Sequence, residues 1–152
     1  MTVCELWSMI PQSEIDRVFQ GTASAELAID FLAFEKCYKF ASILVPETWI
    51  ILDLGCAYAA QAYYFTNHKK YIAVDCYSEI DCFRFQTDNM EFFNMSIQKF
   101  LSTHHFVDLE HVFAICSAVP DEEAQKLTVE MFPNHYVWYP GGIEDFRFEV
   151  KL

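Results

Sequence analysis

The stretch Trp49-Ile-Ile-Leu-Asp-Leu-Gly55-Cys-Ala-Tyr-Ala-Ala-Gln61, followed by Tyr71-Ile-Ala-Val-Asp75, decides the fold of this chain. The apolar runs at 49–52 and 71–74 are typical of buried parallel strands, and Gly55 is typical of a tight turn. The alanine-rich segment between them predicts a helix from Ala57 to Phe65. Together these features predict a βαβ unit.

An acidic residue closes the second strand of this unit. Asp75 lies 20 residues after Gly55, about where nucleotide-binding βαβ units place a carboxylate that accepts both hydroxyls of a ribose. Strand, carboxylate and spacing agree, so we expect Asp75 to bind a ribose. The plain alternative is a carboxylate that caps the turn after the strand.

Two glycine patterns compete for the turn, and each lacks two of its glycines here. The pattern G-x-G-x-x-G of dinucleotide-binding folds aligns with Gly55, Ala57 and Ala60, whereas D-x-G-x-G-x-G aligns with Asp53, Gly55, Ala57 and Ala59. A carboxylate two residues before the glycine favours the second pattern. A dehydrogenase would also need a substrate domain, for which 152 residues leave no room.

The segment Ile-Leu-Asp53-Leu-Gly55-Cys, with Ala-Val-Asp75 after it, resembles the class I S-adenosylmethionine-dependent methyltransferase family. The resemblance covers residues 25–139 in the order of elements and is specific across residues 50–75. It implies that the turn backbone at Gly55 and Ala57 approaches the methionine part of the cofactor. It also implies that Asp53 bonds near the amino group of that part.

The same resemblance assigns the rest of a cofactor site. Asp75 would take the ribose hydroxyls, Cys76 or Tyr77 would lie on the adenine, and the stretch from Asn94 to Ser96 would approach the exocyclic amine. Cys116 or Ser117 would lie nearest the reacting centre. Each has a structural alternative, since Asp53 can cap a turn, Tyr77 can be core, Asn94 can end a strand and Cys116 can be a small buried residue.

The alanines are the main departure from the family pattern. Ala57 and Ala59 add β-carbons where the family has glycines, and Tyr58 stands between them. If either position needs a positive φ, alanine costs about 1 kcal/mol there, and its methyl takes space from the ligand. Cofactor binding is therefore expected to be weak or lost. Three classes stay open: a small methyltransferase, a cofactor-binding pseudoenzyme, and an acidic binding or inhibitory protein on the same fold.

Composition and charge bound the other possibilities. A chain of 17.8 kDa that is 53% hydrophobic predicts one domain over 1–152, with N-terminal helices over 1–45 and a Rossmann-like core over 46–152. No signal peptide is recognisable, and the apolar segment 25–45 carries too many charges for a membrane span, so we expect a cytoplasmic protein. The scattered cysteines and histidines predict neither a disulfide nor a metal site.

The net charge of −12 makes direct binding of nucleic acid phosphates improbable on electrostatic grounds. It allows a surface that imitates nucleic acid or docks on a basic partner. The sequence Cys116-Ser-Ala-Val-Pro120 also lacks the Asn/Asp-Pro-Pro-aromatic motif of methyltransferases that act on amino groups of nucleic acid bases. That substrate class therefore loses support.

The remaining segments complete an α/β pattern. Helices are expected at 13–19, 24–43, 78–87, 96–103 and 120–131, and strands at 92–95, 112–116, 135–139 and 146–150. This alternation predicts a doubly wound, mostly parallel Rossmann-like sheet of five or six strands, with order 3-2-1-4-5 and a crevice above strands one and four. At most one strand of the family's closing hairpin fits after Gly142. An uncovered sheet edge invites another chain, so we expect a homodimer or a protein partner.

Overall fold

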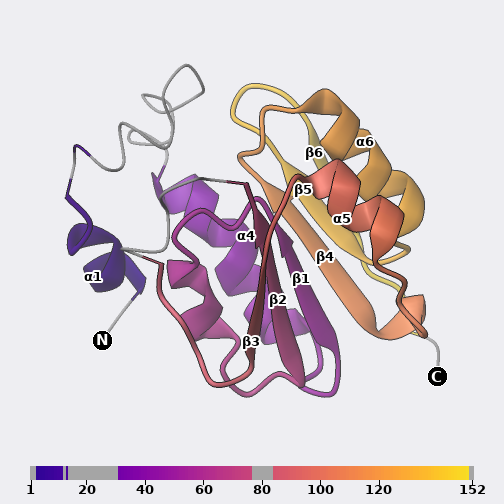
Figure 1. Cartoon of the computed structure of the whole chain (residues 1–152), viewed down its shortest axis with the longest axis horizontal. Coiled ribbons are helices and arrows are strands. Elements are labelled where there is room, and N and C mark those ends of the chain that lie inside the picture. The colour runs from indigo at the N-terminus through magenta and orange to yellow at the C-terminus, as the bar shows by residue number, and fades with distance from the viewer. Residues whose placement is uncertain (1–2, 12, 14–30, 77–83, 151–152) are drawn as a thin grey trace.

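The computed structural model describes residues 3–11, 13, 31–76 and 84–150 (Figure 1). Its helices are α1 (Val3–Ser8), α4 (Phe31–Leu44), α5 (Ile97–Thr103) and α6 (Glu122–Met131), with the 3₁₀ turns η1 (Ala60–Tyr64) and η3 (Leu109–His111). Its strands are β1 (Ile50–Leu54), β2 (Lys70–Asp75), β3 (Met90–Asn94), β4 (Val112–Ser117), β5 (His135–Trp138) and β6 (Glu144–Arg147).

The six strands form one sheet in the order β3-β2-β1-β4-β5-β6. Strands β1 to β5 are parallel, and β6 pairs with β5 in the antiparallel direction. The expected order 3-2-1-4-5 is confirmed, with β1 and β4 adjacent at the centre. Their carboxyl ends meet at one edge, because Leu54 lies opposite Val74 of β2 and Cys116 of β4.

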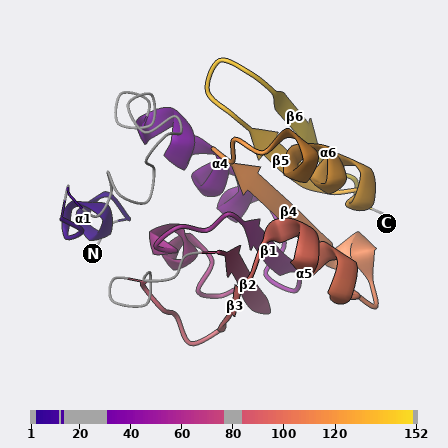
Figure 2. The ribbon, with the colours of Figure 1, turned by 45° about the horizontal axis from the view of Figure 1, so that its top comes forward.

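Two apolar layers hold the sheet. Alternate side chains of the strands face opposite sides, so Ile51, Tyr71 and Phe113 join one core cluster, which includes residues of α4 and η1. Leu52 and Ala114 join the other, which includes residues of α5 and α6. Figures 1 and 2 show α4 on one side of the sheet and α5 and α6 on the other. This covering of both faces explains the continuous apolar runs at 49–52 and 112–116.

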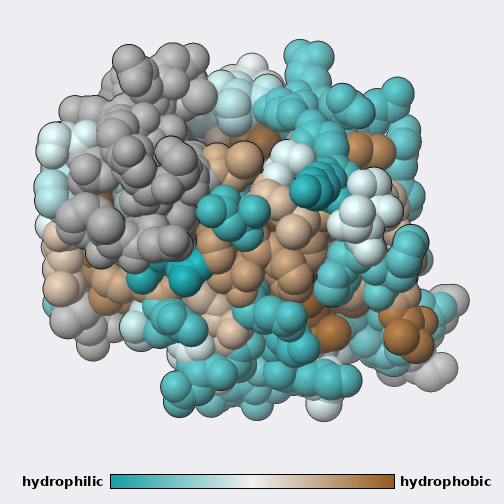
Figure 3. Space-filling view, in the orientation of Figure 1, coloured by the Kyte–Doolittle hydropathy of each residue, from teal (hydrophilic) through white to brown (hydrophobic). Residues whose placement is uncertain are grey.

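The face that carries α5 and α6 is mixed in polarity. Hydrophobic residues gather in the middle of this face, and hydrophilic residues border them above and below (Figure 3). Within the ranges that the structure describes, no helix is long and apolar enough to cross a bilayer.

Several element boundaries differ from the sequence-based expectation. The helix expected at 57–65 is only the 3₁₀ turn Ala60–Tyr64, because Ala57 and Ala59 have the positive φ values of 48° and 58° that a right-handed helix excludes. Strand β3 begins at Met90 rather than at residue 92, and β6 spans Glu144–Arg147 rather than 146–150.

Other expected helices fall wholly or partly outside the described residues. These are the helix at 13–19, the first part of the helix at 24–43, and residues 78–83 of the helix at 78–87. Residues 84–87, which the structure does describe, are not helical. Helix α6 begins after Asp121, whose carboxylate accepts the amides of Glu123 and Ala124, and not at Pro120.

Candidate cofactor site

The turn after β1 has the backbone shape of a glycine-rich loop. Gly55 has φ of 82°, and Ala57 and Ala59 share the left-handed region. The amides of Gly55 and Cys56 both donate to the carbonyl of Val74, at 2.8 and 3.1 Å, which holds the turn against the end of β2. The chain thus keeps a conformation that suits glycine at two positions where it carries alanine, at a cost of about 1 to 2 kcal/mol for each.

Asp75 fastens this turn from the neighbouring strand. Its Oδ2 accepts the amide of Ala57 at 2.8 Å, and its Oδ1 accepts the amide of Cys76 at 2.7 Å. The carboxylate is half-buried at the carboxyl end of β2. These two amides hold one carboxylate oxygen against the turn and the other against the residue that follows the strand.

The other expected adenosine contacts lie near Asp75. Asn94 ends β3 directly opposite Asp75 in the sheet and is exposed. Ser96 is exposed and caps α5, where its hydroxyl accepts the amide of Lys99 at 3.1 Å. Cys76 is an exposed free thiol, and Tyr77 lies outside the described residues.

The space over Gly55 is filled by a valine from the loop after β4. A β-carbon added to Gly55 would lie 2.4 Å from Cγ2 of Val119 and 3.9 Å from Cδ1 of Ile97. Val119 follows Ala118, which has a φ of 59°. No pattern in the sequence predicts this contact, because it joins two loops that lie 64 residues apart. Val119 therefore lies over the turn where the resemblance would put the methionine part of a cofactor.

Asp53 points into the core rather than into the crevice. It is fully buried, and its two oxygens accept the hydroxyls of Tyr38, at 2.9 Å, and of Tyr71. Burial raises the pKa of Asp53 to about 7, although the two tyrosine hydrogen bonds lower it. Its carboxylate thus links α4, β1 and β2 beneath the turn, and the bond to a cofactor amino group stays a prediction.

The residues at the end of β4 are also buried. Cys116 has no exposed surface, and burial raises its pKa to about 12. Ser117 is 2% exposed and lies 3.2 Å from the Sγ of Cys37, whose pKa burial raises to about 11. Neither Cys116 nor Ser117 presents an accessible base or nucleophile at the crevice.

Sequence reasoning missed two tyrosines and the valine. The sequence pattern predicts only an apolar strand around Tyr71 and a helix around Tyr38, yet both tyrosines donate their hydroxyls to Asp53. A buried aspartate in the middle of the sheet was the available signal, because such a charge needs hydrogen-bond donors around it. The position of Asp53 in the sequence does not show which side chains would supply these hydrogen-bond donors.

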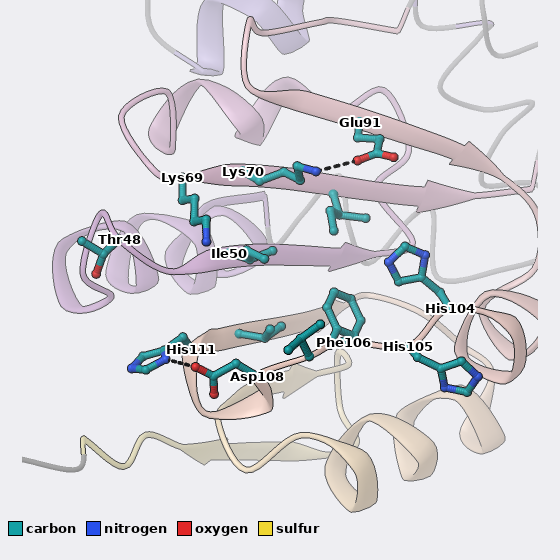
Figure 4. Close-up of a pocket in the computed structure, with 13 residues that line it drawn as sticks. Thr48, Ile50, Lys69, Lys70, Glu91, His104, His105, Phe106, Asp108 and His111 are labelled. Carbon is teal, nitrogen blue, oxygen red and sulfur yellow. Dashed lines mark hydrogen bonds and ion pairs between the residues drawn. The ribbon is translucent and has the colours of Figure 1, made fainter.

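A hollow lies at the edge of the sheet opposite to Asp75, at the amino ends of β1, β2 and β4 (Figure 4). It has a volume of about 500 Å³ and carries Lys69, Lys70 and three histidines among its lining residues. Glu91 pairs with Lys70 at 3.0 Å, and Asp108 pairs with His111. Nothing in this hollow selects one class of ligand. Among the described residues, no cluster of three or more histidine, cysteine, aspartate or glutamate side chains could hold a metal ion.

Comparison with solved structures supports the methyltransferase fold. The chain superimposes on the plantazolicin methyltransferase BpumL in complex with SAH with a TM-score of 0.51 and 17% identity, over 89% of this chain and 59% of that protein. A putative S-adenosylmethionine dependent methyltransferase from Listeria monocytogenes gives 0.45 and 12%, over 70% of this chain and 54% of that one.

The chain spans less than two thirds of each of these proteins. No family model matches the sequence, and no curated protein does either. The strand order and the likeness to BpumL show that the fold is the Rossmann-like fold found in S-adenosylmethionine-dependent methyltransferases.

Proposed function

We propose that this chain binds S-adenosylmethionine, or its demethylated product, at the carboxyl ends of β1 and β2, as a small methyltransferase-like protein of weak or lost activity. The observation that carries the proposal is the 2.8 Å hydrogen bond from the Ala57 amide to Asp75. It joins a left-handed turn to an acidic strand end, and those are the two elements that the ribose and the methionine of this cofactor require. The fold shared with a methyltransferase in complex with SAH supports it.

The residues fit the two ends of the cofactor unequally. At the ribose end, Asp75 is half-buried and held in position by two backbone amides. At the methionine end, the backbone of the turn has the required shape, but Val119 packs on Gly55. The placed carboxylate supports binding at the ribose end, whereas Val119 and the methyls of Ala57 and Ala59 oppose binding at the methionine end.

The chemistry that such a cofactor supplies is a methyl group on a sulfonium. The contribution of the protein to methyl transfer is mainly to hold acceptor and donor in line. Because Cys116 and Ser117 are buried, they supply no accessible base. Any transfer by this chain would thus depend on positioning by the crevice.

Calorimetric titration with S-adenosylmethionine and with its demethylated product tests the proposal. Asp75→Ala should weaken binding by about 1.5 to 3 kcal/mol, the contribution of charge-assisted hydrogen bonds. Asp88→Ala is the matched control, since it removes an exposed carboxylate outside the turn. Tight binding that Asp75→Ala leaves unchanged would refute the ribose assignment. No binding by the parent protein at millimolar cofactor would refute the cofactor site.

A second candidate is an acidic binding or inhibitory protein on this fold. The contact of Val119 with Gly55 favours it, because it closes the methionine end, and the net charge of −12 suits a basic partner. If the chain is such a protein, it should bind no cofactor. It should capture a basic partner at low salt and release that partner at high salt. A partner retained at high salt would contradict electrostatic docking.

A further inference from the structure

We infer that β6 pairs with β6 of a second copy of this chain, so that the two sheets join edge to edge. Strand β6 is the outer strand of the sheet beyond β5 (Figure 2). An exposed edge strand offers unpaired main-chain groups that can bond another strand. The inference concerns a surface away from the candidate cofactor site and does not depend on it.

The hydrogen-bond pattern of the hairpin shows which main-chain groups face outward. The amide of Tyr139 donates to the carbonyl of Ile143 at 2.9 Å, just beyond the strands. Paired residues in an antiparallel ladder alternate between bonded and non-bonded pairs. The pairs Val137 with Asp145 and His135 with Arg147 therefore face β5. The main-chain groups of Glu144 and Phe146 point toward the open edge.

The charges of β6 are complementary to themselves in one register. Asp145 and Arg147 share one face of the strand, and Phe146 lies on the other. An antiparallel pair centred on Phe146 places Asp145 of each copy opposite Arg147 of the other, which forms two ion pairs. The neighbouring registers, centred on Asp145 or on Arg147, place like charges opposite each other. The sequence of β6 thus favours the register centred on Phe146.

The side chains are available for these contacts. Arg147 is exposed, and its side chain makes no hydrogen bond or ion pair with another described residue. Asp145 remains 41% exposed while it accepts from His135 at 2.9 Å. Asp145 and Arg147 carry opposite charges at this edge, and the Arg147 side chain has no partner among the described residues of its own chain. A second copy in this register supplies such a partner.

An apolar surface continues on the other face of the same edge. Phe146 is 42% exposed and packs on the ring of Phe40 of α4, with ring centroids 5.4 Å apart. Phe40 is 45% exposed, and Ile43, nearly one helical turn further along α4, is 80% exposed. A second copy in the register centred on Phe146 would bring its own Phe146 directly opposite and shield this surface from water.

Two complementary charge variants test the inference by sedimentation. Arg147→Glu places Asp145 opposite a glutamate, and Asp145→Lys places Arg147 opposite a lysine. Each variant alone should raise the dissociation constant of the dimer by about tenfold or more. An equimolar mixture restores both ion pairs and should dimerise like the parent chain. Lys99→Glu on α5 is the matched charge control and should leave dimerisation unchanged.

The outcomes separate this surface from other contacts. A parent chain that stays monomeric up to millimolar concentration overturns the inference, as does a dimer that Arg147→Glu does not weaken. Asp145→Lys loses the contact with His135, so circular dichroism checks its fold. If it does not fold, the comparison of Arg147→Glu with Lys99→Glu still decides, because only the first lies on the open edge.

Discussion

Val119 packs directly on Gly55, so that a β-carbon on the glycine would lie 2.4 Å from Cγ2 of the valine. Gly55 also has φ of 82°, a conformation that side chains other than glycine rarely adopt. We expect Gly55→Ala to lower the free energy of unfolding by about 2 to 5 kcal/mol, from left-handed strain and overpacking together. Urea unfolding of the parent chain and the variant measures this difference in the free energy of unfolding.

A double-mutant cycle can separate the part of this stability loss that is due to the clash with Val119. Val119→Ala should recover about 1 to 3 kcal/mol in the Gly55→Ala background, because the truncated side chain no longer overlaps the new methyl. It should also strengthen cofactor binding in the parent chain if Val119 obstructs the methionine end. Additive effects of the two substitutions on stability would contradict a direct clash.

Ala57 and Ala59 should tolerate glycine better than a neighbouring alanine does. Ala62, in η1, is also fully buried but lacks a positive φ. Glycine at all three positions loses a buried methyl and gains chain entropy on unfolding, but only at positions 57 and 59 does it relieve strain. We expect a difference of about 1 to 2 kcal/mol in favour of Ala57→Gly and Ala59→Gly over Ala62→Gly, by thermal unfolding. Equal losses at all three positions would argue against left-handed strain.

The stability of the chain should fall with rising pH because of Asp53. Its folded pKa of about 7 exceeds the ordinary value of about 4 for an aspartate. Between these values the folded state retains a proton that the unfolded state has released. The contribution is complete below about pH 4 and decreases by up to about 1.4 kcal/mol per pH unit as pH rises toward 7.

Asp53→Asn should remove this decrease, because asparagine fills the same space without ionising. Urea unfolding of both proteins at about pH 4.5, 6 and 7.5 measures the two slopes. Asp108 and Asp121 have lowered pKa values, caused first by hydrogen bonds from His111 and Gln98. Their contributions disappear only as pH falls below about 4, outside this window. Parallel slopes for the two proteins would show that Asp53 is not the source.

Thiol labelling should report on the candidate site. Cys76 is exposed next to Asp75, whereas Cys37 and Cys116 are buried with raised pKa values. A maleimide should therefore modify Cys76 in the native protein, with Cys37 and Cys116 reacting only after unfolding. Bound cofactor should slow labelling of Cys76, as peptide mapping by mass spectrometry would detect. Labelling at an unchanged rate under saturating cofactor would contradict an adenosine position beside Cys76.

The sheet was predictable because each strand carries its own apolar pattern. Residues 49–52, 71–74 and 112–116 are continuous apolar runs, and parallel strands buried on both faces require such runs. The shape of the turn was not predictable from the alanines, since propensity favours a right-handed helix for alanine. The hydrogen bonds of Gly55 and Cys56 to Val74 and the bond of Asp75 to Ala57 override that local preference.

The environment of Asp53 was beyond sequence reasoning for a different reason. Its partners Tyr38 and Tyr71 lie 15 and 18 residues away along the chain, and only the packing of α4 against the sheet brings them together. The motif that marked Asp53 as a cofactor contact is equally compatible with a buried carboxylate. The sequence therefore predicts that Asp53 lies at the end of a strand, but it does not predict which way the side chain points.

Asp75 is already immobilised before any ligand arrives. The amides of Ala57 and Cys76 fix its two oxygens, so the rotamer freedom of this carboxylate is lost during folding. A ligand that uses Asp75 does not have to order it, which spares an entropic cost of about 0.5 to 1.5 kcal/mol per side chain. A ribose that binds as proposed would thus meet a preorganised carboxylate at this strand end.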